Sequence, residues 1–186
     1  MTSLRTLPTL SKEETSVEGC ILIHIPVYED MRGIFAEAVN ELHLKELGLP
    51  VDWPQDNISS SHKNVLRGLH IQKNNPQGKL VRCVRGKILD VCLDLRKESP
   101  TFLKHTSVIL DDPSNALYCP PGTAHGFFAI EEGMIYYKCT SLYDKSSDGG
   151  IWAHDPELNI EWPTAHSIMS DKDMSLPKLE EFLKRW

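Results

Sequence analysis

The sequence has little of what marks a secreted or membrane-bound chain. No run approaches the roughly 18 uninterrupted apolar residues that a membrane span needs, and residues 1–18 contain three glutamates where a secretory signal would have its apolar centre. The five cysteines are odd in number and never form a CxxC pair, which argues against a disulfide framework and against a thiolate zinc site. We therefore expect a cytoplasmic protein with no membrane partner.

Basic residues are too few for a typical nucleic-acid-binding protein, because 20 Lys and Arg stand against 26 Asp and Glu. Small anions remain suitable ligands, since a few local arginines outweigh the global charge of −6. The chain lacks internal repeats and Gly/Ser linkers, so we expect a single domain over residues 1–186. Neither GxxxxGK[ST] nor GxGxxG precedes a helix, so neither a nucleoside triphosphatase nor a dehydrogenase is indicated.

Short strands dominate the pattern from Cys20 to about Lys138. In Leu89–Leu95 apolar and polar residues alternate, which predicts a half-buried strand. Other β-rich runs bounded by turn residues are Ile21–Ile25, Leu80–Val84, Thr106–Leu110, Ala124–Ile130 and Met134–Thr140. Asp111–Asn115 and Arg85–Lys87 have turn chemistry. Regular short strands with tight turns favour an all-β antiparallel sandwich or barrel.

Two helices are expected at the edges of this β region. One spans Glu37–Leu47, where Gly48 supplies a left-handed cap and Pro50 prevents continuation. The other spans about Leu176–Trp186, with Ser175 as its N-cap and Pro177 in its first turn. Its apolar stripe of Leu179, Phe182 and Leu183 indicates a packing role.

Two segments of the chain carry histidines in a pattern that indicates the fold. Pro120 to His125 matches the PxGxxH half of the cupin signature, in which Gly122 allows the sharp turn that aims the histidine inward. Metal-binding cupins resemble one another in carrying two histidines one residue apart, but this chain reads His70-Ile71-Gln72 and then brings in Lys79. We therefore expect a cupin-type jelly-roll β-barrel with a few short flanking helices, whose histidines transfer protons.

An ordered series of motifs runs over roughly residues 20–173. It consists of Asp30–Glu37, Gln55–Asn57, Arg67–Gln72, Gln77–Arg82, Asp94–Arg96, Ser99–Phe102, Ala124–Phe127, Tyr137–Thr140, Asp155–Pro156, Ile160–Pro163 and Ser170–Asp173. The series resembles the dTDP-4-dehydrorhamnose 3,5-epimerase family. The resemblance implies an isomerase of deoxysugar biosynthesis that needs no cofactor. Its substrate would be a nucleotide-linked 4-keto-6-deoxyhexose, inverted at C3, C5 or both, most simply dTDP-4-dehydro-6-deoxyglucose giving dTDP-4-dehydrorhamnose.

The resemblance also implies a catalytic role for each of five residues. His70 would be the base and Asp173 would orient and charge its imidazole, while Tyr137 would return the proton from the opposite face. Lys79 would stabilise the enolate oxygen with support from His125. These types suit the chemistry, because imidazole titrates near neutrality, a phenol donates from a fixed position, and an ammonium stabilises developing negative charge.

Nucleotide binding is implied in the same way. Arg32 and Arg67 resemble the diphosphate contacts of the family. The positions that would frame base, sugar and phosphates are Phe35, Glu37, Gln55, Asn57, Tyr143 and Lys172. Part of this set would come from the partner subunit, so a homodimer is implied. Ile71 departs from the aromatic of the family pattern RGLHYQ, and we expect the catalytic set to persist while the substrate envelope differs.

Three alternatives stay open at this point. A C3-only or C5-only epimerase acting on a related dTDP-, CDP- or GDP-4-keto sugar needs the same residue types. A metal-dependent cupin dioxygenase would use His62, His70 and His125, although His62 lies beyond ligand spacing, near an expected turn at Ser59–Ser61. A non-catalytic sugar-nucleotide binding protein would have no use for a base, an acid and an orienting carboxylate together. The remaining histidines are interpreted as structural: His24, His43, His105, His154 and His166.

Overall fold

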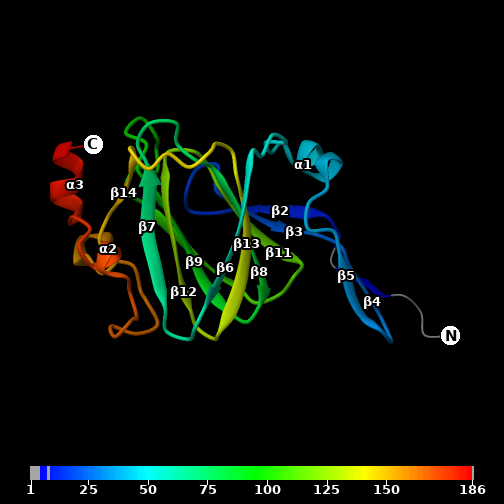
Figure 1. The fold of residues 1–186 in the computed structure, drawn as a ribbon. Helices are drawn as coiled ribbons and strands as arrows, with labels where there is room; N and C mark the ends of the chain where they lie inside the picture. The colour runs from blue at the N-terminus through cyan, green and yellow to red at the C-terminus, as the bar shows by residue number, and fades with distance from the viewer. Residues whose placement is uncertain (1–4, 8, 186) are drawn as a thin grey trace.

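Two antiparallel sheets face each other in this computed structural model, which describes residues 5–7 and 9–185 (Figure 1). In spatial order the larger sheet contains β2 (Ser11–Glu14), β3 (Ile21–His24), β11 (Asn115–Cys119), β8 (Lys79–Arg85), β13 (Gly133–Cys139) and β6 (Gln55–Ser61). The smaller contains β10 (His105–Leu110), β9 (Ile88–Asp94), β12 (Thr123–Ala129), β7 (Leu66–Gln72) and β14 (Asp148–Gly150). The predicted all-β, cupin-type jelly roll is confirmed.

A third, small sheet forms an arm beside the barrel. It consists of β1 (Arg5–Leu7), β4 (Val27–Asp30) and β5 (Gly33–Ala36), paired in the order β1-β4-β5. The arm projects from the end of the molecule opposite to the C-terminal helix (Figure 1). The large side chains at its tip are exposed, Met31 at 89% and Phe35 at 65%. The arm therefore presents apolar surface that the other described residues do not cover.

All six predicted strands are present, and each end lies within one residue of its expected place. The prediction for Leu89–Leu95 is wrong in one respect, because β9 is buried along both faces. Its leucines and Val91 pack against the C-terminal part of the chain, while Cys92 belongs to the core between the sheets. The predicted turn at Ser59–Ser61 is also wrong, since these serines end strand β6.

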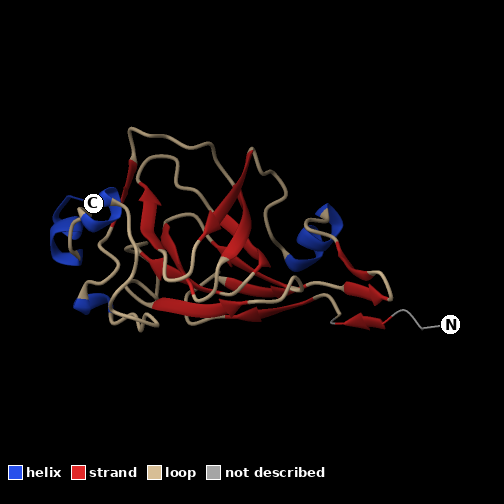
Figure 2. Cartoon of the chain, turned by 60° about the horizontal axis from the view of Figure 1, so that its bottom comes forward, coloured by secondary structure: helices blue, strands red, loops and turns tan. Residues whose placement is uncertain are grey.

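The helices are short and lie at the two ends of the barrel (Figure 2). Helix α1 (Glu41–Leu47) begins later than predicted, because the Asn40 side chain accepts from the Leu42 and His43 N–H groups and so caps it. Gly48 closes it in the left-handed conformation, as expected.

The C-terminal helix, α3 (Leu179–Arg185), is shorter than the prediction, and Trp186 lies outside the described residues. Ser175 is not its N-cap but ends the preceding helix α2 (Asp171–Met174). A free N–H group in the first turn of α3 is satisfied by a residue remote in sequence, because Leu179 N donates to the Asp155 carboxylate at 2.6 Å. The same carboxylate caps the 3₁₀ helix η1 (Pro156–Leu158). The predicted packing role of α3 is confirmed by the burial of Leu179 and Phe182.

Apolar side chains form three layers around the two sheets. One cluster fills the space between them, with Val81, Leu117 and Ile135 from the larger sheet meeting Ile88 and Phe127 from the smaller. A second lies between the smaller sheet and α3, and a third between the larger sheet and α1. The interior cluster occupies only part of the barrel, so the rest can hold polar groups. No helix within the described residues is long and apolar enough to cross a membrane.

Candidate active site

Two adjoining cavities lie between the sheets where the apolar core ends. The larger measures about 340 Å³ and the smaller about 190 Å³. Both are lined by His70 of β7, Lys79 of β8 and Tyr137 of β13, so that an imidazole of the smaller sheet faces a phenol and an ammonium of the larger sheet. Three of the five predicted catalytic residues, His70, Lys79 and Tyr137, thus surround one space.

His70 is held by a buried carboxylate. Its Nε2 lies 2.6 Å from Oδ1 of Asp173, whose side chain is 5% exposed. Asp173 belongs to α2, and its second oxygen accepts from Gly68 N at 3.3 Å. Burial opposes ionisation of Asp173, but the hydrogen bonds from His70 and Gly68 prevail and hold its pKa below the usual value. Because an ionised carboxylate only accepts, Nε2 carries the proton, which leaves Nδ1 as the basic nitrogen.

The strand that carries His70 runs unusually close to its neighbour. A Cβ added at Gly68 would lie 2.7 Å from Gly126 Cα and 2.8 Å from the His125 carbonyl oxygen, and the φ of Gly68 is +117°. Only glycine tolerates both this close approach and a positive φ. The close approach keeps β7 against β12, where His70 and His125 are directly paired across the strands.

A second imidazole and carboxylate lie deeper in the barrel. His125 Nε2 is 2.8 Å from Oδ1 of Asp90, which is completely buried. Burial raises the pKa of Asp90, against the opposing effect of His125. Its other oxygen is the one buried side-chain oxygen or nitrogen without a hydrogen-bond partner in the described part of the chain. Asp90 was not among the predicted site residues, although an aspartate among the apolar residues of a strand was a usable signal.

Lys79 and Tyr137 come from neighbouring strands of the larger sheet. Lys79 pairs with Cys139 across β8 and β13, and Tyr137 lies two residues earlier on the same face. Burial lowers the pKa of the Lys79 ammonium and raises the pKa of the Tyr137 phenol. Burial thus removes water from both groups, so that either one interacts with a charge developing in the cavity more strongly than it would in water.

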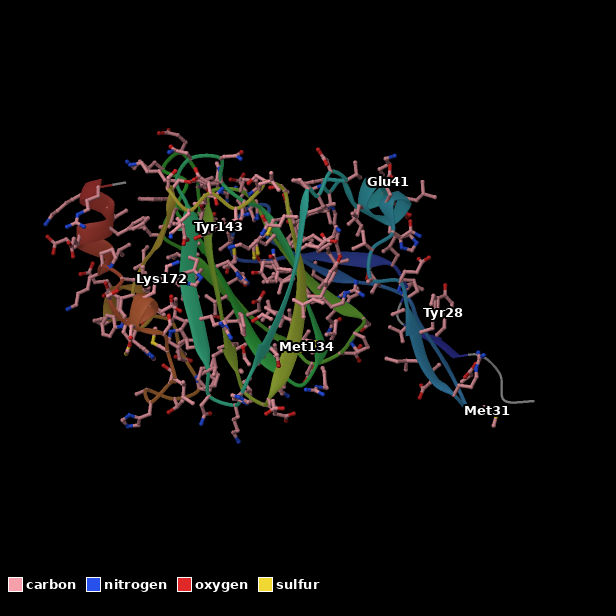
Figure 3. All side chains as sticks on the ribbon, in the orientation of Figure 1. Tyr28, Met31, Glu41, Met134, Tyr143 and Lys172 are labelled. Atoms are coloured by element: carbon pink, nitrogen blue, oxygen red, sulfur yellow. The ribbon has the colours of Figure 1, made fainter. Side chains whose placement is uncertain are left out.

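Several predicted binding residues surround the larger cavity. Gln55, Asn57, Tyr143 and Lys172 line it, whereas Arg67 lines the smaller one. The Tyr143 hydroxyl donates to Asp148 at 2.8 Å, and the Lys172 ammonium donates to the same carboxylate at 2.5 Å. Figure 3 shows both side chains on the same side of the barrel. Four polar lining residues were not predicted to bind: Gln72 and Gln77 lay inside quoted motifs, Ser59 was assigned to a turn, and Asp148 gave no clear signal.

The other predicted binding residues do not reach this cavity within one chain. Arg32 and Phe35 lie on the arm, where the Arg32 guanidinium pairs with Asp30 and Phe35 is exposed. Glu37 follows β5 and accepts from Asn40 beside α1. Figure 3 shows Met31, at the tip of the arm, at the opposite end of the molecule from Tyr143 and Lys172.

The dioxygenase alternative loses its ligand set. His62 is 87% exposed and pairs with Glu132 at 3.1 Å. His70 and His125 are each bound to a different carboxylate. Among the described residues, none of the side-chain groups spaced to hold a metal ion includes His62 or His70.

Comparison with known proteins agrees with the geometry. The family model described as dTDP-4-dehydrorhamnose 3,5-epimerase matches residues 14–181. The chain belongs to this family. The Methanothermobacter thermautotrophicus family member is 46% identical over 173 residues, which cover 90% of this chain and 94% of the relative.

Solved structures of family members superpose closely. The Bacillus anthracis dTDP-4-dehydrorhamnose 3,5-epimerase with TDP and PPi bound has a TM-score of 0.88 at 39% identity, covering 92% of this chain and 100% of that one. The Legionella pneumophila dTDP-6-deoxy-D-glucose-3,5-epimerase in complex with dTDP-4-keto-L-rhamnose has a TM-score of 0.88 at 36% identity, covering 92% and 94%. The family predicted from the motifs is therefore confirmed.

Proposed function

We propose that this protein is an epimerase that inverts C3 and C5 of dTDP-4-dehydro-6-deoxyglucose and so forms dTDP-4-dehydrorhamnose. The observation that carries the proposal is that His70 and Tyr137, on opposite sheets, line the same cavity with Lys79. A hydrogen beside a ketone is acidic because its removal gives an enolate, so inversion needs a base on one face of the sugar and an acid on the other. Both groups are side chains of this chain, and the reaction requires no redox step.

His70 is the base in this proposal. Its Nδ1 removes the proton from carbon, and the imidazolium that forms is stabilised by Asp173, 2.6 Å from Nε2. The carboxylate also fixes the ring, because it is buried and held by Gly68 N. A positioned general base contributes about 10²–10⁴-fold in rate.

Lys79 and His125 act on the oxygen of the enolate. Negative charge moves from carbon to this oxygen as the proton leaves, and a buried ammonium stabilises it more strongly than water does. Lys79 is 9% exposed and lines both cavities, and His125 lines the smaller one. Tyr137 then donates its phenolic proton to carbon from the opposite face, which completes the inversion.

The nucleotide would be bound by two subunits of a homodimer in the cytoplasm. One subunit offers Gln55, Asn57, Tyr143 and Lys172 around the larger cavity and Arg67 beside the smaller. Arg32, Phe35 and Glu37 lie on or beside the arm, away from the cavity of their own chain, and would serve that of a partner. The exposed apolar tip of the arm supports this arrangement, because the described residues of a single chain leave it uncovered. Arg32→Ala should raise KM more than it lowers kcat.

Exchange of solvent deuterium into the sugar tests the proposal. Wild-type protein in heavy water with dTDP-4-dehydro-6-deoxyglucose should incorporate deuterium at C3 and at C5, detected by NMR and mass spectrometry. His70→Asn should lower the exchange rate by about 10²–10⁴-fold, and Tyr137→Phe should slow formation of the inverted product.

A matched control and three outcomes decide between the alternatives. His62→Asn changes an exposed histidine outside the cavity and should leave the exchange rate as it is. Deuterium at one carbon only would identify a single-centre epimerase. Tight binding of the nucleotide sugar without any exchange would identify a binding protein, and full turnover by His70→Asn would refute the assignment of the base.

A further inference from the structure

Three cysteine side chains meet inside the barrel. The sulfur atoms of Cys20, Cys92 and Cys119 all lie within 4.8 Å of one another, and the three residues are at most 1% exposed. All five cysteines of the chain are free and buried, but within the described residues only these three thiols gather in a group spaced to hold an ion. Cysteines far apart in the sequence thus form a compact set of sulfur ligands without a CxxC motif.

Strand register explains the convergence. The β3–β11 ladder pairs Ile21 with Tyr118, so the next pair outward is Cys20 with Cys119 on the same face of the larger sheet. Cys92 faces them from β9 of the smaller sheet. The three ligands therefore come from both walls of the barrel, and their spacing is maintained by two sheets.

The three sulfur atoms share one small space, because no two of them are more than 4.8 Å apart. Sulfurs that surround one ion at bonds of about 2.3 Å lie about 4 Å apart, so little movement is needed for all three to bind one ion.

The net charge of an ion bound by three thiolates determines which element suits this site. Thiolates prefer soft ions, but three thiolates around a monovalent or divalent ion leave a net negative charge, which is costly in an apolar interior. A divalent ion also requires a fourth ligand. The candidates beside Cys119 are His125, whose Nε2 is paired with Asp90 at 2.8 Å, and the unpartnered oxygen of Asp90, which would add a further negative charge to the complex. A trivalent, three-coordinate element gives a neutral complex and needs no further ligand.

We propose that Cys20, Cys92 and Cys119 form a three-sulfur binding site for trivalent arsenic or a similar thiophilic trivalent element. With arsenous acid, three As–O bonds break and three As–S bonds form. Each thiol proton leaves with one hydroxide as water, so three waters are released and no atom is oxidised or reduced.

Sodium arsenite added to the reduced full-length protein tests this site. X-ray absorption at the arsenic edge should show three sulfur neighbours and no oxygen, and mass spectrometry should show one arsenic gained and three hydrogens lost per chain. The thermal midpoint should rise with arsenite concentration, because the ligand binds the folded site. Arsenite uptake is measured after incubation both at room temperature and a few degrees below the thermal midpoint, so that slow access to the buried thiols does not limit it.

Single cysteine variants identify the ligands. Cys20→Ala, Cys92→Ala and Cys119→Ala should each raise the dissociation constant for arsenite more than about 100-fold, since even the loss of an outer-shell partner costs 10–100-fold at metal sites. Cys83→Ala is the matched control, because Cys83 is a buried thiol of the same core outside the group, and it should bind like wild type. Two sulfur neighbours and one oxygen, equal loss in Cys83→Ala, or no uptake under either condition would overturn the proposal. The X-ray result on wild type decides even if a variant fails to fold.

Discussion

Replacement of Asp173 by asparagine isolates the contribution of the carboxylate behind His70. Asparagine keeps the size of the side chain and an oxygen that can accept from Nε2 but removes the charge. The hydrogen bond is 2.6 Å long and the aspartate is 4% exposed, so water cannot take its place. A hydrogen bond to a charged group contributes about 1.5–3 kcal/mol, which corresponds to a loss of roughly 10- to 160-fold in kcat. KM should change much less, because the carboxylate does not line the cavity.

Asp173→Asn should also change how the stability of the fold depends on pH. The pKa of Asp173 is lowered in the folded protein, so its ionised form stabilises the fold above the unfolded pKa of about 3.9. That contribution is lost as the pH falls through the folded pKa. Asp173→Asn should therefore unfold at lower urea than wild type at pH 7, and the difference should shrink towards pH 3.

Asp155→Asn is the matched control for this variant. Asp155 is equally buried, at 3%, and accepts from Leu179 N and Glu157 N, but it lies outside the cavity. It should lower the urea midpoint and leave kcat unchanged, as measured by the deuterium-exchange assay and by urea unfolding. If Asp173→Asn retained full kcat, or if Asp155→Asn lost as much, the carboxylate would not be orienting the base.

Three further substitutions test the scaffold by urea unfolding. Gly68→Ala forces a Cβ to within 2.7 Å of Gly126 Cα at a φ of +117° and should cost about 1–3 kcal/mol or more; an unchanged midpoint would show that the strands can separate freely. Phe182→Ala opens a cavity between α3 and the smaller sheet and should cost about 3–5 kcal/mol; a loss below 1 kcal/mol would mean that α3 does not stabilise the barrel. Asp94→Asn removes a carboxylate whose pKa is lowered by Arg96 and neighbouring hydroxyls despite burial, so it should destabilise at pH 7 and much less below pH 3; an equal effect at both would contradict the ionised state of Asp94.

Local patterns predicted most strands of the site but not all of them. Strand β9 has a strong apolar alternation and was placed to within one residue. Strands β8, β12 and β13, which carry Lys79, His125 and Tyr137, were also placed to within one residue, because each keeps a run of β-forming residues. Strand β6 was not predicted and its serines were assigned to a turn, because its inward residues line a polar cavity and follow no apolar period. Strand β7 was not among the runs predicted from the local pattern, since it carries Arg67, Gly68 and His70 for reasons of geometry and chemistry. Where polar side chains of a site interrupt the apolar period, the pattern that reveals a strand is weakened.

The sequence by itself determined the residue types, the cupin-like histidine segment and the family, because ordered motifs and strand periods are properties of neighbouring residues. Only the tertiary structure decided that His125 meets Asp90, that Arg32 lies away from the cavity of its own chain, and that three separated thiols converge. Such contacts depend on strand register and on the way two sheets close over each other. Both are set by contacts between residues distant in sequence, which no local period records.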